Sequence, residues 1–369
     1  EMALSRRKAL ALIGGGTVLA ATGAVGGFAA TRTPNSAIRP WSLAGQYDDP
    51  RLNALSYALL APNPHNLQPW QVRLEGDTGL TLIRDSTKAL PETDPLDRQI
   101  FIGLGCFIEQ MELAAGAAGY QTEVTLFPEG PDGPVANAEL TRGGKADPLA
   151  AHILMRGSCK EPYEDRTVPA ALANQLELLA DIHTDPAMVD KLRRLTIDAW
   201  MVETMTPRTM QESVDLMRMG KTEINANPDG IDLGGPFLEG LMVAGLLSRE
   251  ALSDPDSSGF QQGLTIYHDM LMATPAYAVI TTKGNTRADQ IAAGRRWLRL
   301  NLATTGMGLS LHPVSQALQE YPEMKEHYAQ AHQMLAPEGH TVQMLGRLGY
   351  GPATQRTPRW PLETKLIDA

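Results

Sequence analysis

The stretch Ala61-Pro62-Asn63-Pro64-His65-Asn66-Leu67-Gln68-Pro69-Trp70 carries more information about this chain than any other segment. Each of its prolines fixes its own φ angle and pushes the preceding residue toward extended geometry. We therefore predict a stiff extended loop that enters a strand at Trp70. The side-chain amides of Asn66 and Gln68 offer hydrogen-bond donors and acceptors, which suits the mixed edge of a heterocycle. A Pro-rich surface turn is the alternative interpretation of the same residues.

The full string resembles the Ser-Pro-Ser-x-x-Asn-x-Gln-Pro-Trp loop of FMN-dependent nitroreductases, and more closely the His-Asn-x-Gln-Pro-Trp form of their Acg-like branch. In those families the loop lies against the flavin. The resemblance implies an α+β, nitroreductase-like fold with FMN as the cofactor. It also implies that the loop contributes cofactor-binding residues, namely Pro62, Asn63, Pro64, Asn66 and Gln68.

A second segment, Arg156-Gly157-Ser158-Cys159-Lys160, resembles the Arg-x-Ser-x-Arg/Lys segment that opens most nitroreductase chains. In that family the segment grips the FMN phosphate and the pyrimidine edge of the flavin. The resemblance therefore implies cofactor-binding roles for Arg156, Ser158 and Lys160. A phosphate monoester carries nearly two negative charges at neutral pH, and basic side chains answer it with charge-assisted hydrogen bonds.

The tail, Arg356-Thr357-Pro358-Arg359-Trp360-Pro361-Leu362-Glu363, follows Gly349-Tyr350 and resembles the family's closing Gly-Tyr … Pro-Arg-Arg-Pro-Leu-Glu. Trp360 stands in place of the second arginine, so the implied phosphate role is shared between Arg356 and Arg359. Solvated charge is the alternative reading of these arginines. The backbone around Gly306 resembles the place where the family approaches N5 of the flavin, and glycine there allows close contact.

The motifs are divided between two halves of the chain. The first half, residues 47–146, has the Asn-x-Gln-Pro-Trp loop but no basic opening segment, and the second half, residues 147–369, has the basic segment and tail but no second loop. In ordinary nitroreductases two identical chains pair and each flavin lies between them. The resemblance therefore implies two tandem nitroreductase-like halves that form a pseudo-dimer within one chain, which reduces the need for a homodimer. Residues 31–46 read as a Pro/Ser/Thr-rich linker.

Hydrophobic periodicity and turn residues predict strands that alternate with long helices, which is typical of an α+β or α/β sandwich. The predicted helices are 50–60, 96–118, 148–156, 169–180, most of 186–226, and 287–305; the predicted strands are 70–75, 79–84, 122–127, 277–282 and 341–348; residues 351–369 form an extended tail. Gly103 and Gly105 fall inside a helical pattern and follow no strand, so they are not a dinucleotide-binding fingerprint. We expect them to let a neighbouring element approach closely.

The N-terminal segment, Ser5-Arg6-Arg7-Lys8 followed by a charge-free run over 9–30, looks like a twin-arginine export signal, although Ala9 stands where Phe is usual. A plain transmembrane helix is the alternative, since the run is long enough to span a bilayer. An uncleaved signal would itself be an anchor. In either case we expect the remainder of the chain on the periplasmic side of the cytoplasmic membrane.

The chain has 369 residues, 43% hydrophobic and 20% charged, with a net charge of −10. This acidity excludes a nucleic-acid partner, and no cysteine or histidine cluster indicates a metal site. We predict an exported FMN-dependent oxidoreductase in which the flavin itself is the catalytic group. NAD(P)H is absent outside the cytoplasm, so a quinol or a partner redox protein is the expected electron donor, with a small-molecule or quinone-type substrate. The alternatives are an FMN-sequestering protein without turnover and an accessory subunit of a membrane complex with a vestigial site.

Overall fold

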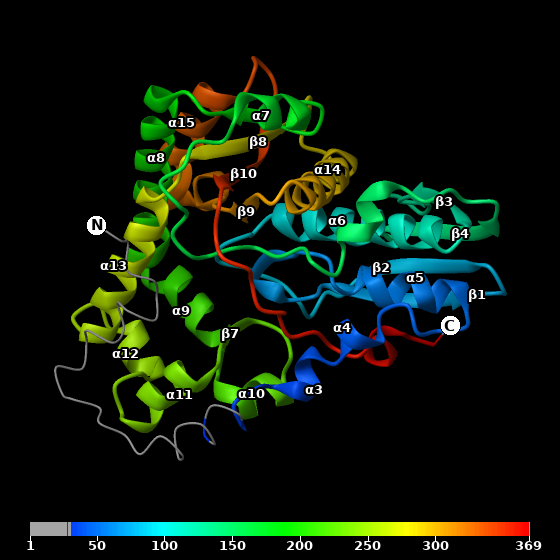
Figure 1. Ribbon diagram of the computed structural model, residues 1–369, viewed down its shortest axis with the longest axis horizontal. Helices are drawn as coiled ribbons and strands as arrows, with labels where there is room; N and C mark the ends of the chain where they lie inside the picture. The colour runs from blue at the N-terminus through cyan, green and yellow to red at the C-terminus, as the bar shows by residue number, and fades with distance from the viewer. Residues whose placement is uncertain (1–27, 29–30, 369) are drawn as a thin grey trace.

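The computed structural model describes residue 28 and residues 31–368 (Figure 1). The predicted signal or anchor over residues 1–30 lies outside the described residues, apart from Phe28. Within the predicted linker the chain folds into two short helices, α3 (Asn35–Ile38) and α4 (Pro40–Leu43). Trp41 of α4 is buried, and its Nε1 donates a hydrogen bond of 2.8 Å to the carbonyl of Thr357. This stretch therefore packs against the C-terminal tail.

The first half forms one antiparallel sheet with strand order β1-β2-β4-β3. Its elements in chain order are α5 (Pro50–Ala58), η1 (Pro64–Asn66), β1 (Trp70–Glu75), β2 (Gly79–Arg84), α6 (Arg98–Ala117), β3 (Tyr120–Leu126) and β4 (Ala136–Arg142). The predicted hairpin is confirmed, with Trp70 opposite Arg84 and Glu75 opposite Gly79. Strand β4 was not predicted, because two of its three buried residues, Ala136 and Ala138, are weak strand formers.

The second half forms a second antiparallel sheet with order β5-β8-β10-β9, and a parallel pair, β6-β7. Its elements are η2 (Pro148–His152), α7 (Ala170–Leu176), β5 (Asp181–His183), α8 (Pro186–Met205), α9 (Pro207–Asp215), β6 (Met217–Met219), α10 (Gly220–Ala226), β7 (Ile231–Leu233), α11 (Pro236–Val243), α12 (Arg249–Ser253), α13 (Ser258–Met272), β8 (Ala276–Thr282), α14 (Arg287–Gly306), β9 (Ser310–Pro313), η3 (Gln316–Leu318), η4 (Pro322–Met324), α15 (Lys325–Leu335), β10 (Thr341–Gly349) and η5 (Leu362–Lys365). The α+β prediction is confirmed. The helix predicted over 148–156 is only a short 3-10 turn, and the helical region predicted over 186–226 is interrupted by β6.

Helices α6 and α14 lie side by side between the two sheets (Figure 1). A Cβ on Gly105 would lie 2.2 Å from the carbonyl oxygen of Ile291, and a Cβ on Gly294 would lie 1.9 Å from that of Ile102. The thiol of Cys106 donates to the carbonyl of Gly294 over 3.1 Å. The two helix backbones thus touch through glycine on both sides. The expectation that Gly105 permits a close approach is confirmed.

Among the described residues, α6 is the one helix long and apolar enough to cross a membrane by length and composition. Most of its apolar stretch is buried inside the protein, against α14 and the core. A core helix passes the same test, and its burial accounts for its apolar sequence.

Replacing Gly294 with Ala is expected to destabilise the protein by about 1–3 kcal/mol, because the added methyl group has no room against the backbone of α6. Gly263 is the matched control: it lies in α13 with nothing within 4 Å of a Cβ. There the same substitution should stabilise by about 0.5–1 kcal/mol, since glycine weakens a helix interior. Urea unfolding of the two variants measures both effects. A Gly294→Ala protein as stable as the wild type would mean that the helices do not pack this closely.

The tail beyond β10 has no regular structure over 350–361, as predicted, and then returns to the first sheet. The amide of Ile367 donates to the carbonyl of Val72 over 2.9 Å, beside an isolated bridge between Val72 and Leu366. The C-terminus consequently lies next to β1 in Figure 1. The tail thereby carries residues of the second half onto the loop that precedes β1.

Candidate functional site

The 61–70 loop is compact rather than extended. Its η1 turn places His65 and Asn66 in the left-handed region, at φ values of 46° and 54°, and Gln68 follows at 55°. The prediction of an extended loop is therefore wrong at these residues, since proline restricts only itself and the residue before it. Left-handed backbone is uncommon outside glycine and persists only where surrounding contacts enforce it. One such contact is the hydrogen bond of 2.7 Å from the amide of Gln68 to Oδ1 of Asn63.

The amides of Gln68 and Asn66 bind the C-terminal tail. Gln68 is fully buried; its Oε1 accepts from the amide of Trp360 over 2.9 Å, and its Nε2 donates to the carbonyl of Pro228 over 2.8 Å. Asn66 accepts from Nη1 of Arg359 over 2.6 Å and donates to the carbonyl of Pro358 over 3.1 Å. Each amide therefore uses both its donor and its acceptor to join the loop to other segments.

Two buried guanidinium groups lie behind this loop. Arg359 donates from Nε to the carbonyl of Leu59 over 2.8 Å, and from Nη2 to the carbonyls of Leu60 and Ala61 over 3.1 and 3.2 Å. Arg156 donates from Nη2 to the same Leu60 carbonyl over 2.9 Å, and from Nη1 to Oδ1 of Asn301 over 3.0 Å. The two cations are therefore neighbours that share one acceptor.

The charge of these two arginines is poorly balanced. They are only 3% and 6% exposed, and the acceptors of their hydrogen bonds within the described chain are neutral oxygens and not carboxylates. Burial lowers the pKa of Arg156 to about 10. Burial, and then the charge of Arg156, lower the pKa of Arg359 to about 9, with Asp232 acting in the opposite direction. In addition, Nε of Arg156 is buried without a hydrogen-bond partner among the described residues. This pair is a positively charged interior site that suits an anion.

Of the remaining residues of the basic segment, Lys160 lies close enough to the loop for its charge to act on His65. Lys160 is exposed, and Ser158 is partly exposed. Burial, and then the charge of Lys160, lower the pKa of His65 to about 4. His65 is therefore neutral at physiological pH, which leaves Lys160 as the cation on this side of the loop.

Three predicted site residues, Ser158, Arg356 and Gly306, are not joined to the loop by any described contact. The guanidinium carbon of Arg356 lies 5.8 Å from the ring centroid of Trp41, in an exposed part of the tail. Gly306 ends α14, where a Cβ would lie 2.5 Å from Nε2 of His152. Of the two tail arginines the structure thus brings Arg359 to the loop. Pro62, Asn63 and Pro64 lie in the loop itself, where Gly103 of α6 gives room for Asn63 and Pro64.

Sequence reasoning missed two charged residues at the loop. Lys365 is buried, and its Nζ donates to the carbonyl of Gln68 over 2.9 Å; burial lowers its pKa to about 8. Asp229 is buried and accepts from Lys88, Arg218 and the indole of Trp360 over 2.6, 2.8 and 2.9 Å. Neither residue stands in a recognisable motif. Only folding brings the tail and the segment before β7 to the loop.

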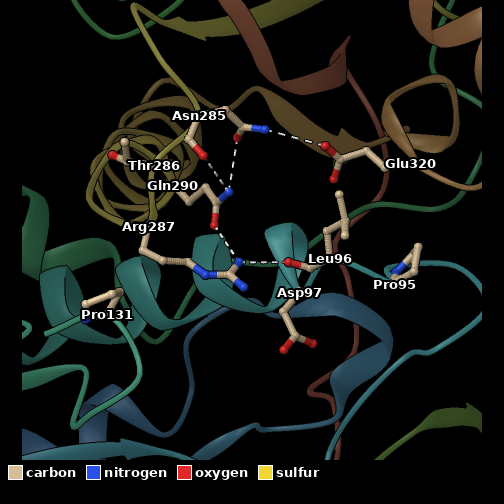
Figure 2. Close-up of a pocket in the computed structure, with 9 residues that line it drawn as sticks. All are labelled: Pro95, Leu96, Asp97, Pro131, Asn285, Thr286, Arg287, Gln290 and Glu320. Carbon is tan, nitrogen blue, oxygen red and sulfur yellow. Dashed lines mark hydrogen bonds between the residues drawn. The ribbon is translucent and has the colours of Figure 1, made fainter.

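A cavity of about 560 Å³ lies elsewhere, where the turn before α6 meets the start of α14 (Figure 2). Arg287 reaches across it and donates to the carbonyl of Leu96 over 2.8 Å and to Oε1 of Gln290 over 3.0 Å. None of the predicted cofactor-binding residues lines this cavity. It is therefore separate from the loop site.

The acid sensitivity of the loop tests the environment of His65. A histidine whose pKa is lower in the folded than in the unfolded state stabilises the fold above its unfolded pKa, and this stability is lost as the pH falls toward the folded value of about 4. The free energy of unfolding should therefore drop between about pH 6.5 and pH 4. His65→Asn, which keeps a residue that tolerates left-handed geometry, should reduce that drop, while the exposed His268→Asn should not. Equal acid sensitivity in the wild type, His65→Asn and His268→Asn would show that the His65 side chain is exposed to water.

No family model matches the chain. The Mycobacterium tuberculosis protein "Putative NAD(P)H nitroreductase Rv3131" is 24% identical over 317 residues, covering 81% of this chain and 84% of the relative. The M. tuberculosis "Putative NAD(P)H nitroreductase acg" is 33% identical over 148 residues, covering 35% of this chain and 44% of the relative.

Among solved structures, a putative nitroreductase from Anabaena variabilis aligns over 86% of this chain and 91% of its own, with 12% identity and a TM-score of 0.39. The FMN-dependent nitroreductase NfnB from Mycobacterium smegmatis, in complex with NADPH, aligns over 58% and 96%, with 17% identity and a TM-score of 0.38. The helices and sheets of the described chain make it an α+β protein, and its loop site is basic and buried. It is a homologue of the Acg-like proteins named NAD(P)H nitroreductases, and the resemblance read from its motifs is confirmed.

Proposed function

We propose that this protein is an exported FMN-binding oxidoreductase of nitroreductase type. The relatives' name supports the redox class. One observation supports the cofactor most directly: Arg156 and Arg359 are buried together at the Leu60 carbonyl with neutral hydrogen-bond acceptors only. Two adjacent buried cations are costly without an anion, and a phosphate monoester would supply the missing negative charge.

The residues present fit the phosphate end of FMN. Nε of Arg156 is a buried donor without a partner among the described residues, and Lys160 is an exposed cation at the loop. Arg359 differs, because its nitrogens already bind loop carbonyls and Asn66. Its part would be to hold the loop in place and to add positive potential. Ser158, between Arg156 and Lys160, would contribute a hydroxyl donor.

When bound, FMN would supply the hydride or electron transfer, and the protein would supply binding, orientation and electrostatics. Asn66 and Gln68 would act by fixing the left-handed loop through the tail. His65, neutral at physiological pH, would add no charge beside the flavin. The flavin itself remains the proposed catalytic group, and no side chain is assigned proton transfer.

Export, location and electron donor extend this proposal. Residues 1–30 read as a twin-arginine signal or an anchor, which favours the periplasmic side of the cytoplasmic membrane. There a quinol or a partner redox protein would replace NAD(P)H as the donor. Spectra of the purified protein, before and after adding quinol or NADPH, decide between donors. Bleaching of the flavin by neither reductant would contradict turnover with these donors.

A flavin-sequestering protein without turnover is the second candidate, and one observation favours it. The segment before β7 covers the loop: Pro228 accepts from Gln68, and the amide of Gly230 donates to the carbonyl of Asn66 over 3.2 Å. Such cover would restrict access to a bound flavin. A yellow protein whose flavin no donor reduces would support this candidate. A colourless protein that does not take up FMN would instead favour the accessory-subunit reading.

One FMN per chain is the expected stoichiometry. Each half contributes one four-stranded sheet and one of the two packed helices α6 and α14, but the loop and the basic segment occur once each. A pseudo-dimer with one complete site and one degenerate site would follow. Absorbance of the released flavin, set against the protein concentration, gives the ratio. Two flavins per chain would contradict the proposed division of the halves.

A further inference from the structure

The segment from α11 to the following turn, Pro236-Phe237-Leu238-Glu239-Gly240-Leu241-Met242-Val243-Ala244-Gly245-Leu246-Leu247, is apolar on nearly all sides, yet it lies at the surface. Val243 is 81% exposed and Leu246 is 52% exposed. A helix without a polar face is normally buried, and a contiguous exposed apolar surface marks an interaction site. We call residues 236–247 the α11 surface.

The one charged residue of the α11 surface is turned inward. Glu239 is buried, and its carboxylate accepts from the amide of Lys221 over 3.1 Å and pairs with Arg32 over 3.1 Å. The outward side is therefore left to Leu, Met and Val side chains and to small residues. This outward side offers no polar side chain for water to hydrate, so its exposure to water is unfavourable.

The charge-free run over 9–30 joins the described chain at the α11 surface. Arg32 pairs with Glu239, and Nζ of Lys221 donates to the carbonyl of Thr31 over 2.8 Å. The residue that directly follows the run is thus fixed beside α11. Val243, the last residue of α11, lies four residues beyond Glu239, which is roughly 6 Å at the helical rise of about 1.5 Å per residue. Any membrane that holds the run therefore lies within reach of the α11 surface.

We propose that the α11 surface inserts into the outer leaflet of the membrane that anchors the chain. Interfacial helices bury their apolar face about 5–10 Å into the boundary between headgroups and acyl chains, which matches this reach. Three exposed charged residues after α11, Glu250, Asp254 and Asp256, are acidic, and the partly exposed Arg249 beside them pairs with Glu223 over 2.6 Å. We therefore expect apolar contact with the acyl chains, and not attraction to anionic headgroups, to supply the driving force.

This contact connects the membrane to the loop site. The α11 surface follows Pro228 and Gly230, which bind the Gln68 and Asn66 segment. The cover of the loop would then lie at the bilayer, where quinone-type substrates dissolve. The lipid contact rests on the anchor proposed for residues 9–30, and its consequence for the loop site rests on the proposed flavin function; lipid contact itself does not require bound flavin.

The test uses the full chain reconstituted in phosphatidylcholine vesicles. Val243→Cys carries an environment-sensitive fluorophore, and Leu178→Cys, 90% exposed just after α7, is the control. Both native cysteines are buried, so labelling is selective. Helix α7 and α11 lie at opposite ends of Figure 1. Lipids with a quencher near the headgroup should quench the label at 243 several-fold more than the label at 178, and high salt should leave this difference unchanged.

Other results overturn the proposal. Equal quenching at the two positions, or failure of the protein to float with the vesicles, would show that the α11 surface does not meet lipid. A blue-shifted but unquenched label at 243 would show that another part of this chain covers it. If that shift disappears when labelled protein is diluted into more vesicles, a second copy is the cover. Because FMN content is measured on the same samples, failure of the flavin proposal is recognised separately.

Discussion

Replacing Arg359 with alanine is expected to destabilise the protein by about 3–5 kcal/mol, since each buried acceptor left without a donor costs about 1–3 kcal/mol. The guanidinium is the donor to the carbonyls of Leu59 and Ala61 and shares that of Leu60 with Arg156. It also holds Asn66, whose left-handed backbone needs outside support. The change would therefore remove the link between the tail and the loop. Chemical unfolding measures the loss.

Arg356→Ala is the matched control for this prediction, three residues earlier in the same tail. Its guanidinium is exposed and, among the described residues, meets the face of Trp41, an interaction worth about 0.5–1 kcal/mol at an exposed site. Arg359→Lys should recover part of the stability, because one ammonium cannot reproduce a fork of donors. If the two alanine variants unfold at the same denaturant concentration, Arg359 does not organise the loop.

The elements that could be predicted from sequence are those in which local and tertiary preferences agree. The hairpin of β1 and β2 has turn residues and β-branched positions in register, and α6 and α14 keep helical spacing over five turns or so, long enough to dominate any local ambiguity. Gly105 could be interpreted as a close approach because it interrupts an apolar pattern without ending it. The missing partner of that contact, Gly294, could be identified only from the structure.

The loop could not be predicted from its own residues. Proline rules act on one residue and its predecessor, while the left-handed turns at His65, Asn66 and Gln68 depend on Trp360 and Pro228, which are far away in sequence. The same reason hides the roles of Lys365 and Asp229. The motifs identified which residue types gather at the site. They did not show that the side-chain amides of Asn66 and Gln68 form their hydrogen bonds with other parts of the protein.

The different roles of Arg156 and Arg359 could not be predicted from the sequence. Arg156 and Arg359 were both expected to bind phosphate, and they lie 203 positions apart. In the structure their roles divide: Arg359 has protein acceptors on all three nitrogens, whereas Nε of Arg156 has none among the described residues. Substitution of the two arginines should therefore have different effects. Loss of Arg359 should act first on folding, and loss of Arg156 on anion binding.

Arg156→Ala is accordingly expected to weaken FMN binding by about 30-fold or more, because truncating one partner of a buried charged contact costs about 2–5 kcal/mol. Arg156→Lys should retain part of the affinity through its charge. Arg98→Ala is the control, since Arg98 is also buried and also donates to backbone carbonyls, those of Gln343 and Leu318, both over 2.7 Å. It should lose stability without losing flavin.

Titration of FMN fluorescence against each protein, at a temperature where all are folded, separates these effects. FMN should also raise the thermal midpoint of the wild type, since an anion would offset the burial and the neighbouring Arg156 charge that together lower the pKa of Arg359. That gain should be smaller in Arg156→Ala than in Arg98→Ala. Equal FMN affinity in the two alanine variants would remove Arg156 from the site, and the buried arginine pair would then be a structural support of the loop alone.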